Sequence, residues 1–292
     1  MFKFGELKDK KIAQKIKNDL VKKSIIIEVK YNYETDLHEL YATKEEDLEE
    51  AFNYFRVVLG FPPVHQVDPE WDKLSKISLG NITKLFIIIS VSLYILIHFL
   101  KMYGLLDLLF ISNSRENLNL ITKDLQIWRL VTPAFLHFSI IHILFNLLWL
   151  KTLGTVVEQT KGWRFYLIMF LISAILSNIL QFYVTGFKFG GMSGFVYSLF
   201  GYLWLHKKFH SHYEFGLPKR DIYLMVGWFF LCFTGLIGNI ANTAHGVGLG
   251  LGMIFAIFPL ERGQTLKYLP WLIFALILSV GTFLIEYFQL LS

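Results

Sequence analysis

The sequence predicts an all-α polytopic membrane bundle preceded by a small N-terminal α/β domain. Apolar residues make up 54% of the 292 positions, well above the usual balance of a soluble domain. Apolar segments follow one another after residue 80, whereas strand-like and helix-like patterns alternate before residue 63. We therefore expect a cytoplasmic domain at 1–63, a polar linker at 64–80, a six-helix core at 81–260 and one further transmembrane helix at 261–292.

The N-terminal domain begins with a predicted strand at Lys3–Leu7 and a helix at Asp9–Lys22, which carries Ile12, Ile16 and Leu20 on one face. A hairpin is expected next, with strands at 24–33 and 38–43 and a turn over 32–36.

The spacing from Thr43 to Glu46 is that of a capping box. It predicts a helix from there to Leu59, which Gly60 and the prolines after it end.

Seven apolar segments are candidates for membrane spans. They lie roughly at 82–103, 132–153, 163–184, 192–206, 222–239, 242–260 and 268–290. A span needs about 20 residues, so the fourth segment is too short to cross alone. Irregular backbone at membrane depth is tolerated only where protein or water covers it. The glycine-rich stretch 186–191 is expected to reach down to the fourth segment.

The charges of the loops indicate the orientation. One set of alternate loops carries nine basic residues: Lys151, Lys161, Arg164, Lys207, Lys208, Lys219, Arg220, Arg262 and Lys267. The other set carries five: Lys101, Arg115, Lys123, Arg129 and Lys188. Basic loops stay in the cytoplasm, so we expect the first set and the N-terminal domain to be cytoplasmic. The second, fourth and sixth segments then run from the outer face to the inner face.

Four polar residues share one depth in this topology. Ser193 starts the fourth segment, His245 lies near the outer start of the sixth, and His142 and Asn146 lie in the outer half of the second. Polar groups at membrane depth are costly and mark functional sites. A serine hydroxyl needs a base to become nucleophilic, and a histidine supplies one. No acidic residue occurs over 222–259, so we expect a Ser193–His245 dyad without a third member.

The tetrahedral intermediate of such a reaction carries an oxyanion, which needs hydrogen-bond donors. Asn146 offers an amide, His142 lies one turn away on the same face, and the Ser193 N–H is a third candidate donor.

Glycines predict that the two catalytic segments pack closely. Gly248 and Gly252 share a face with His245, and this small-xxx-small pair permits close approach. On the fourth segment, Tyr197 and Gly201 follow Ser193 at steps of four; Gly201 would face the glycines and Tyr197 would support the imidazole ring. Each feature alone also fits simple helix packing or a buried polar contact. Their occurrence together at one depth favours a catalytic site.

These motifs resemble those of the rhomboid intramembrane serine proteases, in particular the bacterial branch with a cytoplasmic N-terminal domain. The resemblance runs over about 1–260. It rests on His137–Asn146, on Gly191-Met192-Ser193-Gly194, and on Ala244-His245 with Gly248 and Gly252. Trp128-Arg129 is similar to the Trp-Arg of the family's first external loop, and Glu158 lies where the family has a structural carboxylate.

The resemblance implies a rhomboid-like six-helix core and a serine endopeptidase. Ser193 is the implied nucleophile, His245 the base, and His142, Asn146 and the Ser193 N–H the oxyanion site. The implied supporting residues are His137, Gly191, Tyr197, Gly201, Gly248 and Gly252. The implied substrates are single transmembrane helices that enter past the fifth segment and the loop at 235–243. The implied location is a bacterial inner membrane, with the site open to the outer face. The seventh segment departs from the six-helix pattern.

Other function classes are less well supported by the sequence. Lys and Arg lie in short loops between apolar runs, so the net charge of +5 does not indicate nucleic-acid binding. His206, His210 and His212 are expected in a solvated loop, and neither a metal nor a cofactor is expected. A catalytically silent relative that binds transmembrane helices remains the main alternative. A transporter would need polar groups along a whole path.

Overall fold

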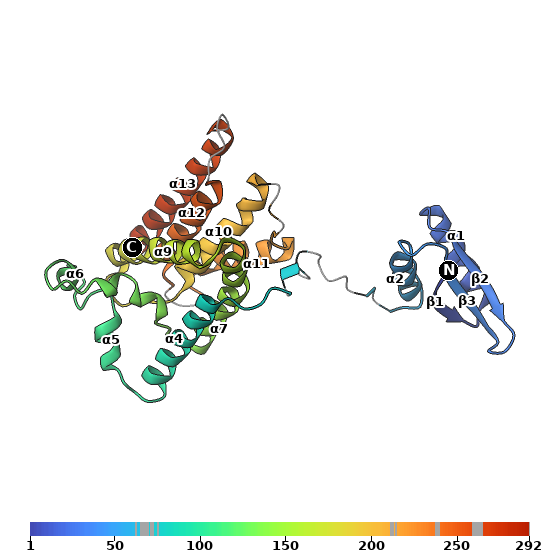
Figure 1. Cartoon of the computed structure of the whole chain (residues 1–292), viewed down its shortest axis with the longest axis horizontal. Helices are drawn as coiled ribbons and strands as arrows, with labels where there is room; N and C mark the ends of the chain where they lie inside the picture. The colour runs from blue at the N-terminus through green and yellow to red at the C-terminus, as the bar shows by residue number, and fades with distance from the viewer. Residues whose placement is uncertain are drawn as a thin grey trace. The chain divides into compact units, whose positions relative to one another are not determined.

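The computed structural model of the chain describes residues 1–61, 63–64, 70, 73–74, 76–210, 213, 215–236, 240–258 and 265–291. The chain divides into two compact units, Met1–Val67 and Asp68–Ser292 (Figure 1). The first unit combines a sheet with two helices, and the described part of the second is helical. The prediction of a membrane bundle after a small α/β domain is confirmed at this level. The finer division into a linker and a separate last helix stays a prediction.

The N-terminal unit is a three-stranded antiparallel sheet with the order β1-β3-β2. Its elements are β1 (Phe2–Leu7), α1 (Lys10–Lys22), β2 (Ile27–Asn32), β3 (Leu37–Ala42) and α2 (Leu48–Val58). The helix α1 starts at Asp9, whose carboxylate accepts hydrogen bonds from two backbone N–H groups of the first turn. Ile16 and Leu20 of α1 are fully buried against the sheet, as the helical spacing predicts.

The capping box predicted at Thr43 is wrong, because α2 begins at Leu48 with Asp47 before it. The Thr43 hydroxyl and the Thr43 N–H both donate to the carbonyl of Ile26, at 2.9 and 3.2 Å. Thr43 therefore prolongs the contact between the two hairpin strands. Its side chain is used there and does not cap the helix.

The second unit contains the following helical elements: α4 (Asn81–His98), α5 (Gly104–Leu109), α6 (Asn119–Thr122), η1 (Ile127–Leu130), η2 (Thr132–Phe135), α7 (Ile140–Trp149), η3 (Leu150–Gly154), α8 (Thr155–Lys161), α9 (Trp163–Thr185), α10 (Ser193–Phe209), α11 (Lys219–Cys232), α12 (Asn242–Ile257) and α13 (Thr265–Gln289). Four stretches of the described chain are long and apolar enough to cross a bilayer: Asn81–His98, Ile140–Lys161, Trp163–Thr185 and Lys267–Gln289. The helices α10, α11 and α12 are shorter, so the count of seven spans stays a prediction.

The second span is displaced from its predicted place at 132–153. A helical run of α7, η3 and α8 extends from Ile140 to Lys161, with one π-turn at Leu150–Gly154. The Ser139 hydroxyl accepts a hydrogen bond from the His142 N–H at 3.1 Å and so fixes the start of α7. The apolar residues before Ser139 form a 3₁₀ turn and a loop. Their hydropathy does not distinguish them from a helix.

The remaining segments begin and end within a few residues of their predicted limits, except that α4 ends at His98 and α11 at Cys232. The predicted limits at 239 and 260, and the proline at 62, lie outside the described residues. Leu74, in the predicted polar linker, is buried in the core of the second unit.

Glu158 holds the start of α4. Its carboxylate accepts hydrogen bonds from the Ile82 N–H, the Thr83 N–H and the Thr83 hydroxyl, each at 2.8 Å. These N–H groups belong to the first turn of a helix and have no intrahelical partner. A side chain at Gly80 would overlap the carboxylate. The contacts agree with the expectation that Glu158 supports the fold.

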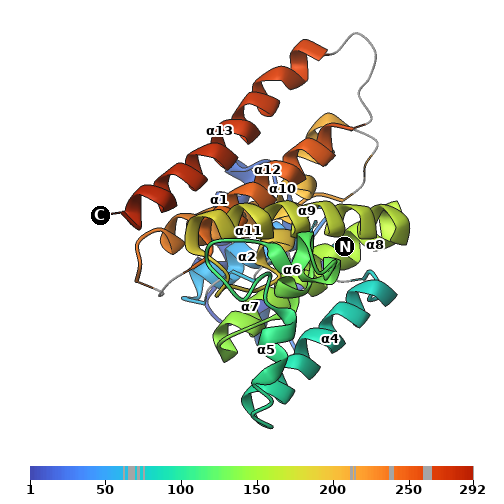
Figure 2. The ribbon, with the colours of Figure 1, turned by 90° about the vertical axis from the view of Figure 1, so that its left-hand side faces the viewer.

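The helix α12 lies at the centre of the second unit, where it packs against α9, α10 and α13. Figures 1 and 2 both show α13 running alongside α12. Most of α10 is buried, as is most of α12. These two inner helices carry the predicted catalytic residues.

Candidate active site

Ser193 is the first residue of α10, and a non-helical segment at 186–192 leads into it. The expectation of irregular backbone before the fourth segment is therefore confirmed. Gly191 has φ +121, a conformation that side chains rarely adopt. Its N–H donates to the carbonyl of Pro133 at 3.0 Å, which fastens the segment to η2. The Ser193 side chain is partly exposed, while Met192 before it is fully buried.

The helices α10 and α12 meet backbone to backbone. A side chain at Gly248 would overlap the carbonyl oxygen of Gly194, and one at Gly252 would overlap that of Ser198. A Cβ at Gly194 would in turn lie 3.3 Å from the carbonyl oxygen of Ala244. Ser193 and His245 are the chain neighbours of Gly194 and Ala244. The two residues are therefore brought to adjacent ends of two touching helices.

His245 is 4% exposed, and its ring packs on the ring of Tyr197 with centroids 4.7 Å apart. The Tyr197 hydroxyl donates to the carbonyl of Met225 in α11 at 3.4 Å. In the described part of the chain, the His245 Nδ1 is buried without a hydrogen-bond partner, and no hydrogen bond joins the Ser193 hydroxyl to the ring. Catalytic hydrogen bonds often form only when substrate is bound.

His142 lies directly over the backbone of Gly191. A Cβ built at Gly191 would lie 2.5 Å from the His142 Nε2, so only glycine leaves room for the ring. Asn146, one turn further along α7, is 6% exposed. Its amide nitrogen donates to the carbonyl of His142 at 2.9 Å, which leaves its second N–H for another acceptor.

His137 is 2% exposed and packs against His142 with ring centroids 5.0 Å apart. The His137 Nδ1 is 3.1 Å from the carbonyl of Phe135, and the His137 carbonyl is 2.9 Å from the His98 Nε2. These contacts place His137 between α4 and the start of α7.

Gly201 faces α12, although not its two glycines. A Cβ at Gly201 would lie 2.5 Å from the carbonyl oxygen of Leu249 and 3.1 Å from the Met253 N. Gly194, which was not predicted to be a packing residue, is the partner of Gly248. The close contact with Gly248 is therefore about two turns nearer to Ser193 than predicted.

Arg129 lies in η1 and joins this 3₁₀ turn to α5. It is 4% exposed, and it donates to the carbonyls of Asp107 at 2.7 Å and Phe110 at 2.8 Å. The Trp128 Nε1 donates to the carbonyl of Leu108 at 3.3 Å. The Trp-Arg pair thus joins η1 to α5 and the residue that follows it.

Two polar residues beside the site were not predicted from the sequence, Gln181 of α9 and Glu286 of α13. The Ala244 N–H donates to the Gln181 Oε1 at 2.9 Å, and the Thr243 N–H donates to the Glu286 Oε2 at 2.6 Å. Both side chains are buried. A polar group in an apolar span is the signal that could have found them.

The expectation of a solvated histidine loop is wrong for His206. It lies in the last turns of α10, is 2% exposed, and has its Nδ1 3.2 Å from the carbonyl of Ala256. Its ring also packs on Tyr202 and His210. His212 lies outside the described residues, and the described ones contain no group of three or more His, Cys, Asp or Glu side chains that could hold a metal ion.

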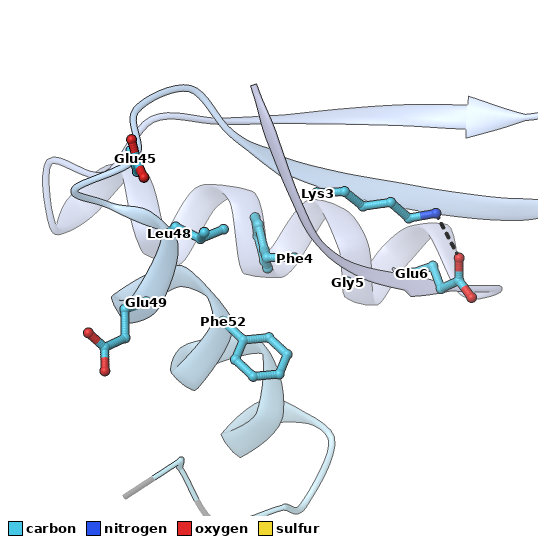
Figure 3. Close-up of a pocket in the computed structure, with 8 residues that line it drawn as sticks. All are labelled: Lys3, Phe4, Gly5, Glu6, Glu45, Leu48, Glu49 and Phe52. Atoms are coloured by element: carbon cyan, nitrogen blue, oxygen red, sulfur yellow. Dashed lines mark ion pairs between the residues drawn. The ribbon is translucent and has the colours of Figure 1, made fainter. Parts of the chain in front are cut away.

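A groove of about 690 Å³ lies in the N-terminal unit (Figure 3). It is lined by Lys3, Phe4, Gly5, Glu6, Glu45, Leu48, Glu49 and Phe52. Its lining combines apolar side chains with three carboxylates and one lysine, and it includes none of the residues predicted for catalysis.

Comparison with known proteins matches residues 124–262 to the Rhomboid domain family. Proteins named Rhomboid protease GlpG from Yersinia pseudotuberculosis serotype I (strain IP32953) and Yersinia pestis (strain Pestoides F) are each 40% identical over 138 residues, or 47% of this chain. The GlpG of Pectobacterium atrosepticum is 38% identical over 137 residues. The matched part is 50% of each relative, so the chain spans about half the length of the curated relatives it matches. All the predicted site residues fall inside 124–262, the part of the chain that matches the Rhomboid domain family and is similar to the GlpG rhomboid proteases.

Proposed function

We propose that this protein is an intramembrane serine endopeptidase that hydrolyses peptide bonds in or next to the transmembrane helices of membrane proteins. The observation that carries the proposal is the backbone contact of Gly194 with Gly248. This contact supports a close approach of the Ser193 and His245 side chains, because both residues lie at the same ends of the two touching helices. The names of the GlpG relatives, which are rhomboid proteases, support the same reaction.

In the proposed reaction, the Ser193 Oγ attacks the carbonyl carbon of the scissile peptide bond. His245 takes the hydroxyl proton and returns it to the leaving amine. A water molecule then attacks the acyl-enzyme, and His245 again transfers the protons. The burial of His245 against Tyr197 supports this role, because it restricts the imidazole to one orientation.

The proposed oxyanion site consists of the Ser193 N–H, His142 and Asn146. The Ser193 N–H is at the start of α10, where helix N–H groups have no intrahelical acceptor and the helix dipole favours negative charge. The second N–H of the Asn146 amide is available for the oxyanion, since the first is bonded to His142.

The proposed substrates are membrane proteins, and the proposed medium is the lipid bilayer of a bacterial inner membrane. A stable helix keeps its peptide bonds hydrogen-bonded and closed to attack. Cleavage therefore requires that the substrate helix unwind locally at Ser193. We place the N-terminus in the cytoplasm and the site toward the outer face, following the loop charges.

A catalytically silent protein that binds transmembrane helices is the second candidate. It would use the same surface of α10 and α12, and the present contacts are compatible with it. The names of the GlpG relatives, which are rhomboid proteases, favour the protease.

The test is cleavage of a reporter with one unstable transmembrane helix by the purified protein in liposomes. We expect cleavage by the wild type, none by Ser193→Ala, and almost none by His245→Ala. Ser114→Ala, on the loop between α5 and α6, is the matched control and should cleave normally. Undiminished cleavage by Ser193→Ala would refute the proposal. Stable binding of the reporter without any cleavage by the wild type would favour the silent alternative.

A further inference from the structure

The last helix, α13, lies beyond the rhomboid domain and packs closely on α12 (Figures 1 and 2). A Cβ at Gly250 would lie 2.8 Å from the carbonyl oxygen of Ala275, and a side chain at Gly246 would overlap Thr282. The glycines of α12 thus allow close packing against two neighbouring helices, α10 and α13. Gly248 and Gly252 face α10, and Gly246 and Gly250 face α13.

Close packing of this kind needs no acidic residue, yet α13 carries Glu286 at 5% exposure. The Glu286 Oε1 accepts a hydrogen bond from the Gln181 Nε2 at 2.9 Å, and its Oε2 accepts one from the Thr243 N–H at 2.6 Å. Gln181 is fully buried, and its Oε1 accepts from the Ala244 N–H at 2.9 Å. Each oxygen of this network therefore has a defined partner.

The network holds the first turn of α12. Thr243 and Ala244 follow Asn242, where the helix begins, so their N–H groups have no acceptor inside the helix. Glu286 and Gln181 supply the two missing acceptors from two other helices. The next residue is His245. The two bonds fix both the rotation of the turn and its position along the helix axis, and therefore the place of the imidazole.

We propose that Glu286 is a positioning residue that acts through Thr243 and Gln181 to hold His245 in reach of Ser193. This inference rests on the proposed function. An acidic residue buried in an apolar helix is expensive and indicates a functional reason. Here the reason is geometric: a displacement of about 1 Å of a catalytic group can cost about 100-fold in rate.

The donors and acceptors of the network give a sharp test. In Glu286→Gln, the new amide can accept from Thr243 only by turning its own N–H toward the Gln181 amide nitrogen, so two donors meet. In Gln181→Glu, the carboxylates of positions 181 and 286 face each other and repel.

In the exchanged double variant, which combines both changes, the carboxylate at position 181 accepts from the Ala244 N–H and from the amide at position 286. The oxygen of that amide accepts from the Thr243 N–H. The three hydrogen bonds named above return with the side-chain bond reversed, and the Thr185 hydroxyl, which accepts from the Gln181 Nε2 at 3.2 Å in the wild type, can donate to the carboxylate at position 181.

The experiment measures reporter cleavage by the full chain in liposomes, together with the rate at which a fluorophosphonate labels Ser193. We expect each single variant to lower kcat and the labelling rate by about 10-fold or more, with KM changed less than about twofold. The exchanged double variant should recover to within about threefold of the wild type. Tyr287→Phe, the neighbouring residue on α13, is the matched control and should behave as the wild type.

Three outcomes would overturn the inference. One is wild-type kcat in both single variants. Another is a double variant that is no better than the worse single variant. The third is a loss of kcat that follows the loss of thermal stability across all variants, which would make Glu286 a stability residue alone. Because Glu286→Gln preserves size, misfolding is not expected to obscure these results.

Amide hydrogen exchange separates this inference from the proposed function. Exchange of the Thr243 and Ala244 amides should be faster in either single variant and slow again in the double variant. If the wild type cleaves nothing and is not labelled, the proposed function fails, whereas restored protection would still demonstrate the network. If the wild type cleaves and exchange is the same in all variants, only the inference fails.

Discussion

At the scale of single residues, the Asn146 amide has two acceptors: the carbonyl of His142 and, in the proposed reaction, the oxyanion. Its side chain is buried and bonds to the carbonyl of its own helix, an interaction that contributes little to stability in a span. The same amide is proposed to donate to the oxyanion, where its effect falls on the transition state. Stability and turnover should therefore respond differently to its loss.

Asn146→Ala should lower turnover by about 100-fold or more, which is typical of a lost oxyanion donor. Thermal stability should change little. Thr152→Val is the matched control, because the Thr152 hydroxyl makes the same kind of bond to the carbonyl four residues earlier in the same helical run. Kinetics in liposomes and thermal unfolding in detergent are the measurements. A fall in stability that accounts for the fall in activity would mean that Asn146 only bridges structure.

At the scale of elements, the sequence locates the helices but not every boundary. The segments at 163–184 and 268–290 agree closely with α9 and α13, because a long apolar run has few alternatives to a membrane helix. The predicted start of the second span was wrong because the helix begins where the Ser139 hydroxyl caps it. The hydropathy of the sequence does not mark this position. The failed capping box at Thr43 has a similar origin, since its hydroxyl bonds to another strand.

The candidate site was predicted better than its support. Ser193, His245, His142 and Asn146 carry local signals, namely polar atoms next to glycine or on one helical face. The hydrogen bond from Gln181 to Glu286 joins residues 105 positions apart. A polar residue in an apolar span can be noticed in the sequence, but no local pattern predicts that these two residues are partners. His206 was misjudged for the same reason, because its partner is the carbonyl of Ala256 on another helix.

The contact of α10 with α12 can be tested by a substitution that adds one methyl group to α12. Gly248→Ala would place a Cβ against the Gly194 carbonyl, and a backbone atom cannot move aside as a flexible side chain does. We expect a destabilisation of about 1–3 kcal/mol or more, which is the usual cost of overpacking, and a loss of fluorophosphonate labelling at Ser193.

Gly281→Ala in α13 is the control for Gly248→Ala. Nothing lies within 4 Å of a Cβ at Gly281, so this change should be neutral or stabilising by about 0.5–1 kcal/mol. Thermal unfolding of both variants in the same detergent is the measurement. Equal stability of the two variants would show that the backbones do not touch as described.

At the scale of the whole molecule, each unit has an apolar core of its own. The described core of the helical unit includes large apolar side chains such as Tyr166, Phe195 and Phe200. The N-terminal unit has a smaller core of its own, and its sheet is also joined by charged side chains at the surface. The Lys3 ammonium on β1 lies 2.6 Å from the Glu39 carboxylate on β3. Acid should therefore act on the N-terminal unit through this pair.

The sign of the effect follows from the two pKa values. The hydrogen bond from Lys3, with further bonds from Tyr41 and Asn32, lowers the pKa of Glu39 to about 2. The bonded carboxylates of Glu39 and Glu6 raise the pKa of Lys3. An unfolded glutamate has a pKa of about 4.3, so the contribution of Glu39 to stability is complete above about pH 4.3 and disappears as the pH falls toward 2. The contribution of Lys3 is complete below its unfolded pKa of about 10.4 and disappears in strong alkali.

Glu39→Gln should therefore destabilise the sheet at neutral pH and make no difference near pH 2. The measurement is the rate at which pepsin cuts the N-terminal unit of the intact chain, with wild type and variant compared at each pH from about 4 down to about 2. The variant should be cut faster at the upper end, and the two rates should converge at the lower end. The Lys3 side chain is exposed and the Glu39 side chain is partly exposed, so added salt should shrink the difference. A ratio of rates that stayed constant with pH would show that Glu39 acts through its shape and not through its charge.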